Sequence, residues 1–163
     1  MNHFSSHILM VYPKNFRSNE LTLDDNTFQK NNSNLSNNEI KDKALVEFEL
    51  LQNKIESQGV KVTIFKDNRD VDTPDAVFPN NWISFHENNK AITYPMFAEN
   101  RRLERTNLVI ECLNNHGKNI SIGYDYSNFE NNGMFLEGTG SLVLDRLNRI
   151  AYCSLSQRSN EDL

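Results

Sequence analysis

The sequence predicts an α/β domain, and three observations lead to that prediction. The chain has 163 residues, of which 37% are hydrophobic and 24% are charged, as in one soluble globular domain. Two segments carry apolar residues at three- and four-residue steps, which is the period of an amphipathic helix. The remaining apolar segments are short and are bounded by proline, glycine or asparagine, which is typical of strands.

The strands predicted in the first part of the chain follow a simple order. "HILMVYP" (7–13) is a short apolar run that a proline ends, and "VKVTIF" (60–65) alternates in polarity as a half-buried strand does. "DAVFPNNWISFH" (75–86) and "KAITYPMF" (90–97) are predicted to form the two strands of a hairpin, joined by "ENN". The polar stretch "NNSNLSNN" (31–38) is predicted to be a linker between the first strand and a helix.

Two helices are predicted. The first runs from Asn38 to about Gln58 and is followed by Gly59, a residue type that commonly ends helices. The second runs from Arg101 to Asn114 and ends in "NHG". The apolar stripes that indicate these helices are Ile40, Ala44, Leu45, Phe48, Leu51 and Ile55 in the first, and Leu103, Leu108, Ile110, Cys112 and Leu113 in the second.

Three further strands are predicted after the second helix, in the segments 119–127, 134–146 and 149–156. From the linker onward the order is helix, strand, hairpin, helix, strand, hairpin, which repeats a unit of about 60 residues. Such units stack or close into rings, because one unit alone leaves a face of its sheet uncovered. An ordinary mixed sheet with two helices is an alternative that fits the same periodicity.

The charge and the lengths of the apolar segments argue against several classes of partner. A net charge of -5 disfavours a nucleic acid or an anionic membrane, because such partners attract basic surfaces. No apolar run reaches the ~18 residues of a membrane helix, and the first residues lack the pattern of a signal peptide. We therefore expect a cytoplasmic protein.

The cysteines and histidines give no support for a metal site. Cys112 and Cys153 lie in apolar segments, where cysteine usually packs as a small buried hydrophobe. No ligand spacing such as H-E-x-x-H links the scattered histidines. These histidines are His3, His7, His86 and His116.

Polar residues interrupt the apolar segments at strand ends, where α/β proteins commonly place site residues. They are Asp75, Asn80 and Asn81, Glu137, Arg158 and the segment "NRRLER" (100–105). Each also has a plain structural interpretation. The chain contains 25 asparagines and six Asn-Asn pairs, so most such pairs mark turns.

The other insertions have structural alternatives as well. Gly138 and Gly140 in "LEGTG" fit a bulge or a close backbone contact in a strand, with Glu137 facing solvent. This segment is not expected to bind phosphate, because it lacks the lysine of a P-loop and is not predicted to lead into a helix. "NRRLER" fits a solvated helix start, and Arg158 fits a surface charge.

Taken together, the motifs resemble those of the guanidine-modifying enzymes of the pentein fold, which include arginine deiminases, dimethylarginine hydrolases and amidinotransferases. The resemblance rests on "PDAVFPNNW", "ENRRLER", "FLEGTGSLVLDR" and "SLSQRSN", in that order. "TPDAVFPNNW", "YPMF" and "EGTGS" are most similar to the citrulline-utilisation hydrolase branch, often labelled amidinotransferase-like. The match covers nearly the whole chain.

The resemblance implies a fold. A pentein is an α/β-propeller of helix-plus-sheet modules around a central site, and this sequence would supply about two and a half of roughly five modules. Residues 1–163 would then be a single incomplete pentein domain, the N-terminal portion of a truncated or split enzyme that lacks its C-terminal catalytic half. We expect a partial ring to leave sheet edges uncovered, which favours self-association.

The resemblance also implies roles for individual residues. Glu137 matches the catalytic-site glutamate that orients a histidine, a role that fixes the tautomer and stabilises the imidazolium. Arg101 and Arg158 match arginines that hold the α-carboxylate of the substrate with a planar, permanently charged fork. Asp75 matches a substrate-binding carboxylate. The family's chemistry uses side chains alone, so no cofactor is expected, and the expected partner is a small amino acid.

Asn80 and Asn81 stand where arginine-processing relatives carry an acidic residue. A guanidinium only donates hydrogen bonds and is best met by carboxylates, whereas a ureido group is neutral and has a carbonyl acceptor beside its N–H donors. An amide can donate to that carbonyl and accept from the nitrogen. The two asparagines therefore predict citrulline rather than arginine as substrate, with ornithine as product.

The catalytic cysteine and histidine of the family have no counterpart in this sequence. Neither Cys112 nor Cys153 matches the nucleophile, and neither His86 nor His116 lies in the expected motif. We expect no turnover from the chain alone. The alternatives to a citrulline hydrolase portion are an arginine deiminase or amidinotransferase-type fragment and a catalytically silent pentein-like module that binds an amino acid or a protein.

Overall fold

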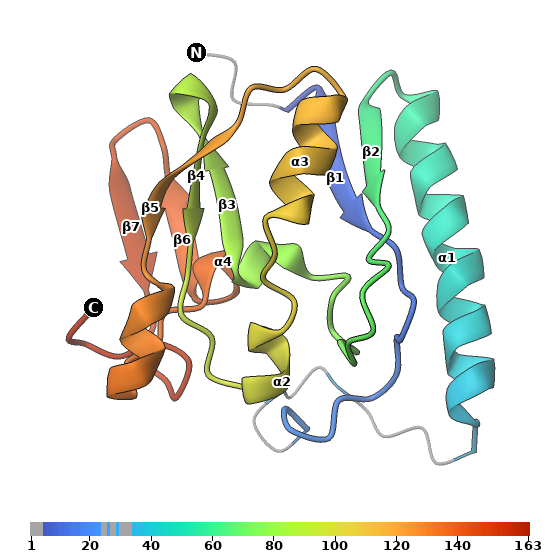
Figure 1. The fold of residues 1–163 in the computed structure, drawn as a ribbon, viewed down its shortest axis with the longest axis horizontal. Helices are drawn as coiled ribbons and strands as arrows, with labels where there is room; N and C mark the ends of the chain where they lie inside the picture. The colour runs from blue at the N-terminus through green and yellow to red at the C-terminus, as the bar shows by residue number, and fades with distance from the viewer. Residues whose placement is uncertain (1–4, 24–25, 27–28, 30–33) are drawn as a thin grey trace. The chain divides into compact units, whose positions relative to one another are not determined.

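The computed structural model describes residues 5–23, 26, 29 and 34–163, and its elements form a mixed α/β fold. The chain divides into two compact units, Met1–Val77 and Phe78–Leu163, each with its own strands (Figure 1). The interpretation of residues 1–163 as a single incomplete domain stays a prediction. Within the described residues, no helix combines the length and the apolar character needed to cross a bilayer.

The first unit is built on two parallel strands and a helix. β1 (His7–Val11) pairs with β2 (Lys61–Phe65) from His7 opposite Lys61 to Val11 opposite Phe65, which confirms both predicted strands. α1 (Asn37–Ser57) connects the strands and lies alongside β2 (Figure 1). Parallel neighbours need such a crossover, because the end of one strand and the start of the next lie at opposite edges of the sheet.

α1 begins and ends close to the predicted positions. The Ser36 hydroxyl accepts from the N–H of Glu39 (3.3 Å), and the Glu39 carboxylate accepts from the N–H of Ser36 (2.8 Å), so the first turn has a complete capping box. Gly59 follows the last turn with φ of +79°, as expected for a stop. The predicted linker therefore ends at Ser36, and its residues 31–33 lie outside the described part of the chain.

The apolar stripe predicted for α1 is only partly buried. Phe48 is the buried residue of the helix, and its ring packs edge-on against Tyr12 with centroids 5.9 Å apart. Leu51, predicted to share the buried face, is 54% exposed. Val46 and Leu50 are also exposed. α1 thus contacts the rest of the first unit through a narrow stripe.

The second unit contains a three-stranded sheet in the order β3-β4-β5. β3 (Ile83–His86) and β4 (Lys90–Thr93) are antiparallel and form the predicted hairpin. The 3₁₀ turn η2 (Glu87–Asn89) joins them, and its two asparagines have left-handed φ angles of 58° and 56°. β5 (Ser121–Asp125) is parallel to β4 and confirms the next predicted strand.

The strand predicted from Asp75 to His86 is wrong over residues 75–82. These residues form turns and the 3₁₀ helix η1 (Pro79–Asn81). Pro79 fixes its own φ near about −65° and lacks an N–H, which suits the first position of a helix and not the interior of a sheet. The two asparagines therefore lie in a tight turn rather than in a strand.

The second predicted helix, Arg101–Asn114, is two helices in the structure. They are α2 (Glu99–Arg102) and α3 (Leu108–Asn115). Between them the hydroxyl of Thr106 accepts from the N–H of Leu108 (3.3 Å). A threonine side chain that bonds to nearby backbone competes with the hydrogen bonds of a continuous helix, which explains the break.

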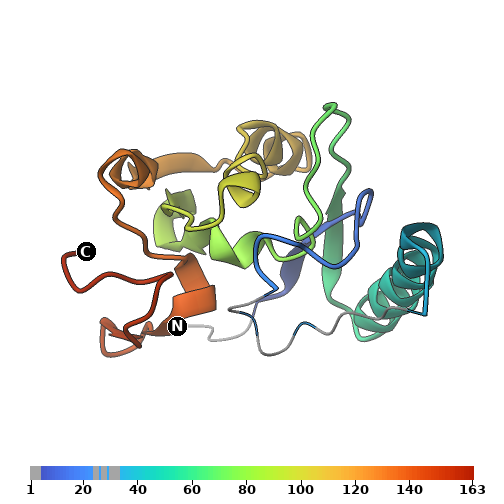
Figure 2. The same ribbon diagram turned by 90° about the horizontal axis from the view of Figure 1, so that it is seen from below.

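The strand predicted over residues 134–146 is confirmed only near its end, because residues 134–137 form no strand beyond the isolated bridge of Leu136. Gly138–Ser141 forms the one-turn helix α4, and β6 (Leu142–Asp145) begins after it. β6 pairs with β7 (Ile150–Cys153) in antiparallel fashion, which confirms the last predicted strand. The 3₁₀ segment η3 (Ser127–Asn132) precedes this region. Figure 2 shows α4 beside β3 and η1.

The β6–β7 ribbon exposes an apolar face. Val143 and Tyr152 lie opposite each other and are 70% and 57% exposed, and Ile150 is exposed on the same face. Cys153 was predicted to be buried, and that prediction is wrong, because the two-stranded ribbon leaves it exposed. Cys112 is half-buried.

The sheets of the described residues stay separate. They are β1–β2, β3–β4–β5 and β6–β7, and none of them closes on itself within the described part of the chain. β5 pairs with the hairpin that precedes it rather than with the one that follows. The strands therefore do not divide into the predicted helix-plus-three-strand units, and the count of two and a half propeller modules is not confirmed.

Candidate functional site

Glu137 lies at the centre of a polar cluster in the second unit. Its side chain is fully buried, so the alternative in which it faces solvent is wrong. Its Oε2 accepts from Nδ2 of Asn81 (2.9 Å) and from Nη1 of Arg158 (3.4 Å). Its Oε1 accepts from the N–H of Phe97 (3.2 Å). A buried carboxylate requires such donors, and three of the predicted site residues meet here.

The segment around Arg158 is held against Glu137 by backbone hydrogen bonds. The N–H of Glu137 donates to the carbonyl of Arg158 (3.1 Å), and the Ser141 hydroxyl donates to the same oxygen (3.5 Å). Leu136 and Ser159 form an isolated antiparallel bridge. The Arg158 side chain is only 19% exposed, so its interpretation as a simple surface charge is wrong.

Two glycines of α4 allow this helix to approach η1. A Cβ on Gly138 would overlap the carbonyl oxygen of Asn80 and lie 3.0 Å from the ring of Tyr94. A Cβ on Gly140 would lie 2.5 Å from Nδ2 of Asn81. Glycine is therefore required at position 138, where the Cβ would meet backbone, whereas a Cβ at position 140 would displace the side-chain amide of Asn81. The predicted close backbone contact is confirmed, but a helix makes it rather than a strand, so the expectation that "LEGTG" leads into no helix is wrong.

Asn80 and Asn81 have opposite surroundings. Asn81 is 9% exposed and donates to Glu137, whereas Asn80 is exposed. The carbonyl of Asn80 accepts from the Thr139 hydroxyl (3.4 Å). Successive residues of a 3₁₀ turn project in different directions, which explains why only one of the pair reaches the carboxylate. A substrate-binding role for Asn80 stays a prediction.

Arg101 is buried and its guanidinium is engaged by protein groups. Nε and Nη2 donate to the two carboxylate oxygens of Glu104 at 2.8 and 3.0 Å, and Nη2 also donates to the carbonyl of Phe78 (3.2 Å). The alternative of a solvated helix start is wrong, because Arg101 is 3% exposed. Glu104 was not predicted, although its three-residue spacing from Arg101 is a signal for a helical ion pair. The contact of Arg101 with substrate stays a prediction.

Asp75 belongs to the first unit, where it is 8% exposed. Its Oδ2 accepts from Nδ2 of Asn19 (2.6 Å) and from the hydroxyl of Thr22 (3.4 Å). Gln29 donates to the carbonyl of Asn19 (2.9 Å) and accepts from the Thr22 hydroxyl (3.1 Å). These supporting residues were not predicted, since no local pattern links them to a residue so far along the chain. The substrate-binding role of Asp75 stays a prediction.

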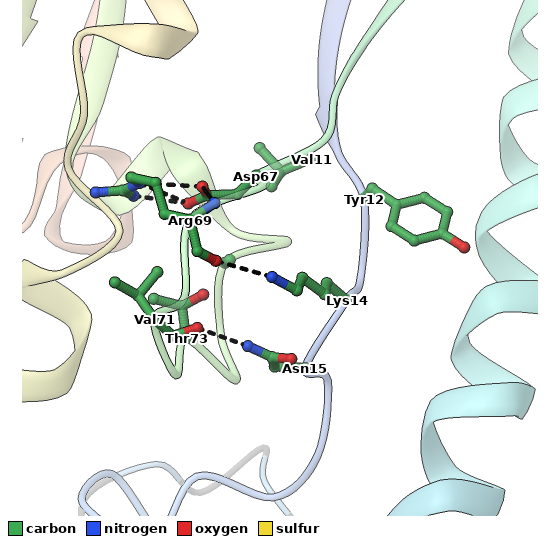
Figure 3. Close-up of a pocket in the computed structure, with 9 residues that line it drawn as sticks. Val11, Tyr12, Lys14, Asn15, Asp67, Arg69, Val71 and Thr73 are labelled. Atoms are coloured by element: carbon green, nitrogen blue, oxygen red, sulfur yellow. Dashed lines mark hydrogen bonds and ion pairs between the residues drawn. The ribbon is translucent and has the colours of Figure 1, made fainter.

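A small hollow in the first unit is lined by other residues. Its lining includes Tyr12, Lys14, Asn15, Asp67 and Arg69 (Figure 3). Lys14 donates to the carbonyl of Arg69 (2.8 Å), Asn15 donates to the carbonyl of Val71 (2.8 Å), and Asp67 pairs with Arg69 (2.6 Å). Burial opposes ionisation of Asp67, but hydrogen bonds from Arg69 outweigh it and lower the pKa of that carboxyl. These contacts brace the segment after β2.

A chain of side chains ties β3 and β4 to the end of β6. The Ser84 hydroxyl lies 2.7 Å from Nε2 of His86 and 2.7 Å from the Tyr94 hydroxyl. Nη1 of Arg146 lies 3.3 Å from Nδ1 of His86. A guanidinium only donates, so Nδ1 accepts and the ring proton is on Nε2. Burial and the charge of Arg146 lower the pKa of His86, and burial raises the pKa of Tyr94.

The cysteines and possible metal ligands of the described residues show no catalytic arrangement. Burial raises the pKa of the Cys112 thiol, which is opposite to the activation of a nucleophile. His116 directs Nδ1 to the carbonyl of Cys112 (2.7 Å) rather than to its thiol. Among the residues that the structure describes, no group of three or more His, Cys, Asp or Glu could hold a metal ion.

Several solved structures share this fold. The N-terminal domain of ArgZ, an arginine dihydrolase from the ornithine-ammonia cycle in cyanobacteria, matches with a TM-score of 0.63 and 16% identity over 96% of this chain and 51% of that chain. A dimethylarginine dimethylaminohydrolase adduct matches with a TM-score of 0.60 and 20% identity over 98% and 52%. AgrE in complex with ornithine and NAD+ matches with a TM-score of 0.62 and 16% identity over 96% and 20%. At these identities the likeness shows the fold alone.

The chain spans about half the length of the first two structures and a fifth of AgrE. No match was found among curated proteins. The fold and the family-model match place the chain in the pentein superfamily of guanidine-modifying proteins, which confirms the resemblance seen in the sequence. Within that superfamily, the chain belongs to the family described as N,N dimethylarginine dimethylhydrolase, eukaryotic, whose model matches residues 12–163.

Proposed function

We propose that the chain is the N-terminal portion of a hydrolase that cleaves a C–N bond in the guanidino or ureido group of a linear amino acid. The observation that carries this proposal is the meeting of Asn81, Glu137 and Arg158 around one buried carboxylate. Membership of the dimethylarginine dimethylhydrolase family supports the same reaction class, as does the fold shared with an arginine dihydrolase.

In this proposal the buried carboxylate of Glu137 orients a histidine that moves protons during the reaction. A carboxylate suits this role when its own orientation is fixed, and Glu137 is fixed by donors on both oxygens. Arg158 is proposed to hold the substrate carboxylate, since its side chain is 19% exposed and carries a planar, permanently charged guanidinium. Substrate-binding roles for Asp75 and for Arg101 are proposed from their motifs alone.

We propose citrulline as the substrate and ornithine as the product. Asn81 presents an amide, which carries both a donor and an acceptor for a neutral ureido group. One N–H of this amide is directed at Glu137, so its Oδ1 and second N–H are the groups that can serve the substrate. An ionised carboxylate at this position would favour a guanidinium instead.

Calorimetric titration of the 163-residue chain with citrulline, arginine and N,N-dimethylarginine tests the substrate proposal. We expect citrulline to bind at least about tenfold more tightly than arginine, equivalent to about 1.4 kcal/mol. Arg158→Ala should weaken citrulline binding by a similar factor. Arg149→Asn is the matched control, because Arg149 is exposed and its φ of 57° suits asparagine. Tighter binding of arginine or dimethylarginine would refute citrulline.

We also propose that the chain alone releases no ammonia from citrulline or arginine. Neither cysteine is matched to the family's nucleophile, and the thiol of Cys112 is not activated. A coupled ammonia assay checks this expectation. Measurable release that Cys153→Ala abolishes would require a different mechanism.

A catalytically silent binding module is the second candidate function. The forked pair between Arg101 and Glu104 favours it, because that pair already occupies guanidinium atoms proposed to hold a substrate carboxylate. A general amino-acid binder should bind citrulline and ornithine equally well, whereas a hydrolase portion should prefer citrulline.

We also propose a cytoplasmic location and self-association through uncovered sheet edges. Sedimentation velocity over a range of concentrations tests the self-association.

A further inference from the structure

The amide of Asn81 has a fixed direction in the structure. Its Nδ2 points at Oε2 of Glu137 at 2.9 Å, and Glu137 is fully buried. An ionised carboxylate only accepts hydrogen bonds, so residue 81 must donate in this contact. The same carboxylate oxygen accepts from Arg158 at 3.4 Å, and the other accepts from the N–H of Phe97. The amide is one of three donors that hold Glu137 from three different segments.

The packing around the amide leaves it little freedom to turn. Asn81 is 9% exposed. A Cβ on Gly140 would lie 2.5 Å from its Nδ2, 2.9 Å from its Cγ and 3.1 Å from its Oδ1, so the amide lies close to the backbone of α4. The backbone oxygen of Asn81 is equally close to α4, 3.0 Å from the position of a Cβ on Gly138. The contact with Glu137 is therefore built into the packing of η1 against α4.

We propose that Asn81 is a positioning residue for Glu137. The charge on Glu137 requires a neutral side chain at position 81, whether or not a substrate is bound. The inference rests on the proposed function only where it treats Glu137 as the group that orients a histidine. It separates two explanations for an asparagine at this position. If the substrate alone set the choice, an aspartate would be tolerated in the empty site, because the two side chains have the same shape.

An aspartate at position 81 would face Glu137 with a second carboxylate at the distance of a hydrogen bond. Two buried carboxylates at such a separation cannot both ionise, and the pair keeps one proton near neutral pH. Arg158 would partly offset the added charge, but it contacts Oε2 at 3.4 Å and is itself partly exposed. The substitution would therefore cost stability through the charge on Glu137, with no ligand involved.

The test compares the pH dependence of urea unfolding for the unliganded chain and for Asn81→Asp between pH 5.5 and 8. In the variant the folded state binds a proton that the unfolded state has lost, so the variant is less stable at high pH and recovers as the pH falls. The ratio of the unfolding constants of variant and parent should rise by up to about tenfold per pH unit. Asn80→Asp is the matched control, because its exposed carboxylate is solvated. Equal stability of Asn81→Asp and parent across this range would overturn the proposal.

If Asn81→Asp does not fold at any pH, the double variant Asn81→Asp/Glu137→Gln decides the question. It reverses the pair, so that an amide at 137 donates to a carboxylate at 81 and a single charge remains. We expect this exchange to restore folding, and a double variant that stays unfolded would overturn the proposal. Neither measurement uses a ligand. A chain that binds no citrulline but shows the pH-dependent loss would therefore refute the proposed function and leave this inference standing.

Discussion

Two buried carboxylates, Asp75 in the first unit and Glu137 in the second, are held in different ways. Asp75 accepts from the side chains of Asn19 and Thr22, which come from an irregular segment 56 and 53 residues earlier in the chain. Glu137 accepts from a side-chain amide, a guanidinium and a backbone N–H. It also precedes a helix whose backbone packs against one of its donors.

The difference indicates that two buried carboxylates can contribute differently to the stability of the fold. The support of Asp75 includes two neutral side-chain donors that single substitutions can remove. The support of Glu137 includes a backbone N–H that no substitution short of proline can remove, and a packing contact that only glycine permits. Changes at Glu137 should therefore propagate further than changes at Asp75.

Replacing each carboxylate with alanine gives the largest expected effects and tests the comparison directly. Glu137→Ala leaves an amide, a backbone N–H and a guanidinium without their acceptor, and we expect a loss of about 3 kcal/mol in the free energy of unfolding. Asp75→Ala should cost about 1–2 kcal/mol. Urea unfolding at pH 7 measures both. An equal or larger loss for Asp75→Ala would break the comparison.

Adding a methyl group at Gly138 tests the packing that supports Glu137. The new Cβ would overlap the carbonyl oxygen of Asn80, so we expect Gly138→Ala to cost about 2–3 kcal/mol. Gly123→Ala is the control, because its Cβ would meet only the side chain of Lys90, at 3.3 Å. The control should change stability by less than about 1 kcal/mol. Similar losses for both variants, measured by thermal unfolding, would contradict the packing argument.

Removing one donor tests the support of Asp75. Asn19 is fully buried, and Asn19→Ala deletes a hydrogen bond of 2.6 Å to the carboxylate. We expect a loss of about 1–2 kcal/mol in the free energy of unfolding. Asn53→Ala, on the exposed surface of α1, should be nearly neutral. If the two variants were equally stable in urea, Asp75 would not depend on Asn19.

The smallest expected effect is a loss of stability at low pH. It sharpens the comparison, because it assigns a pH-dependent stability to the second unit through His86. Burial and Arg146 lower the pKa of His86 in the folded chain, so the unfolded state binds more protons once the pH falls below about 6.5. Stability is therefore lost as the pH falls through this range. The urea midpoint of the parent should drop more between pH 7 and 5 than that of His86→Gln. Parallel curves would show that His86 does not contribute.

Most of the regular elements could be predicted from local patterns. α1 has a capping box at one end and a left-handed glycine after the other. β1, β2 and β7 are short apolar runs that lie within the predicted segments, although β1 and β7 are shorter than predicted. The failures come from contacts that local patterns do not contain. One such contact is the packing of α4 against η1, which lies far earlier in the sequence.

The residues of the candidate site could be predicted where they lie within recognisable sequence motifs. Asn81, Glu137 and Arg158 were singled out as polar residues at predicted strand ends, the resemblance implied their roles, and the structure brings them together. Asn19 and Thr22 were missed, because nothing near them in the sequence indicates a partner more than fifty residues away. α4 was also missed, because four residues with two glycines have little intrinsic preference for a helix.

The exposed apolar face of the β6–β7 ribbon affects how experiments on this chain should be interpreted. Val143, Ile150 and Tyr152 present a hydrophobic surface even when every element is in place. Dyes such as ANS brighten on contact with such a surface and are commonly used to detect loosely packed intermediates. A bright dye signal from this chain would therefore report the native ribbon, and near-ultraviolet circular dichroism is the better indicator of intact packing.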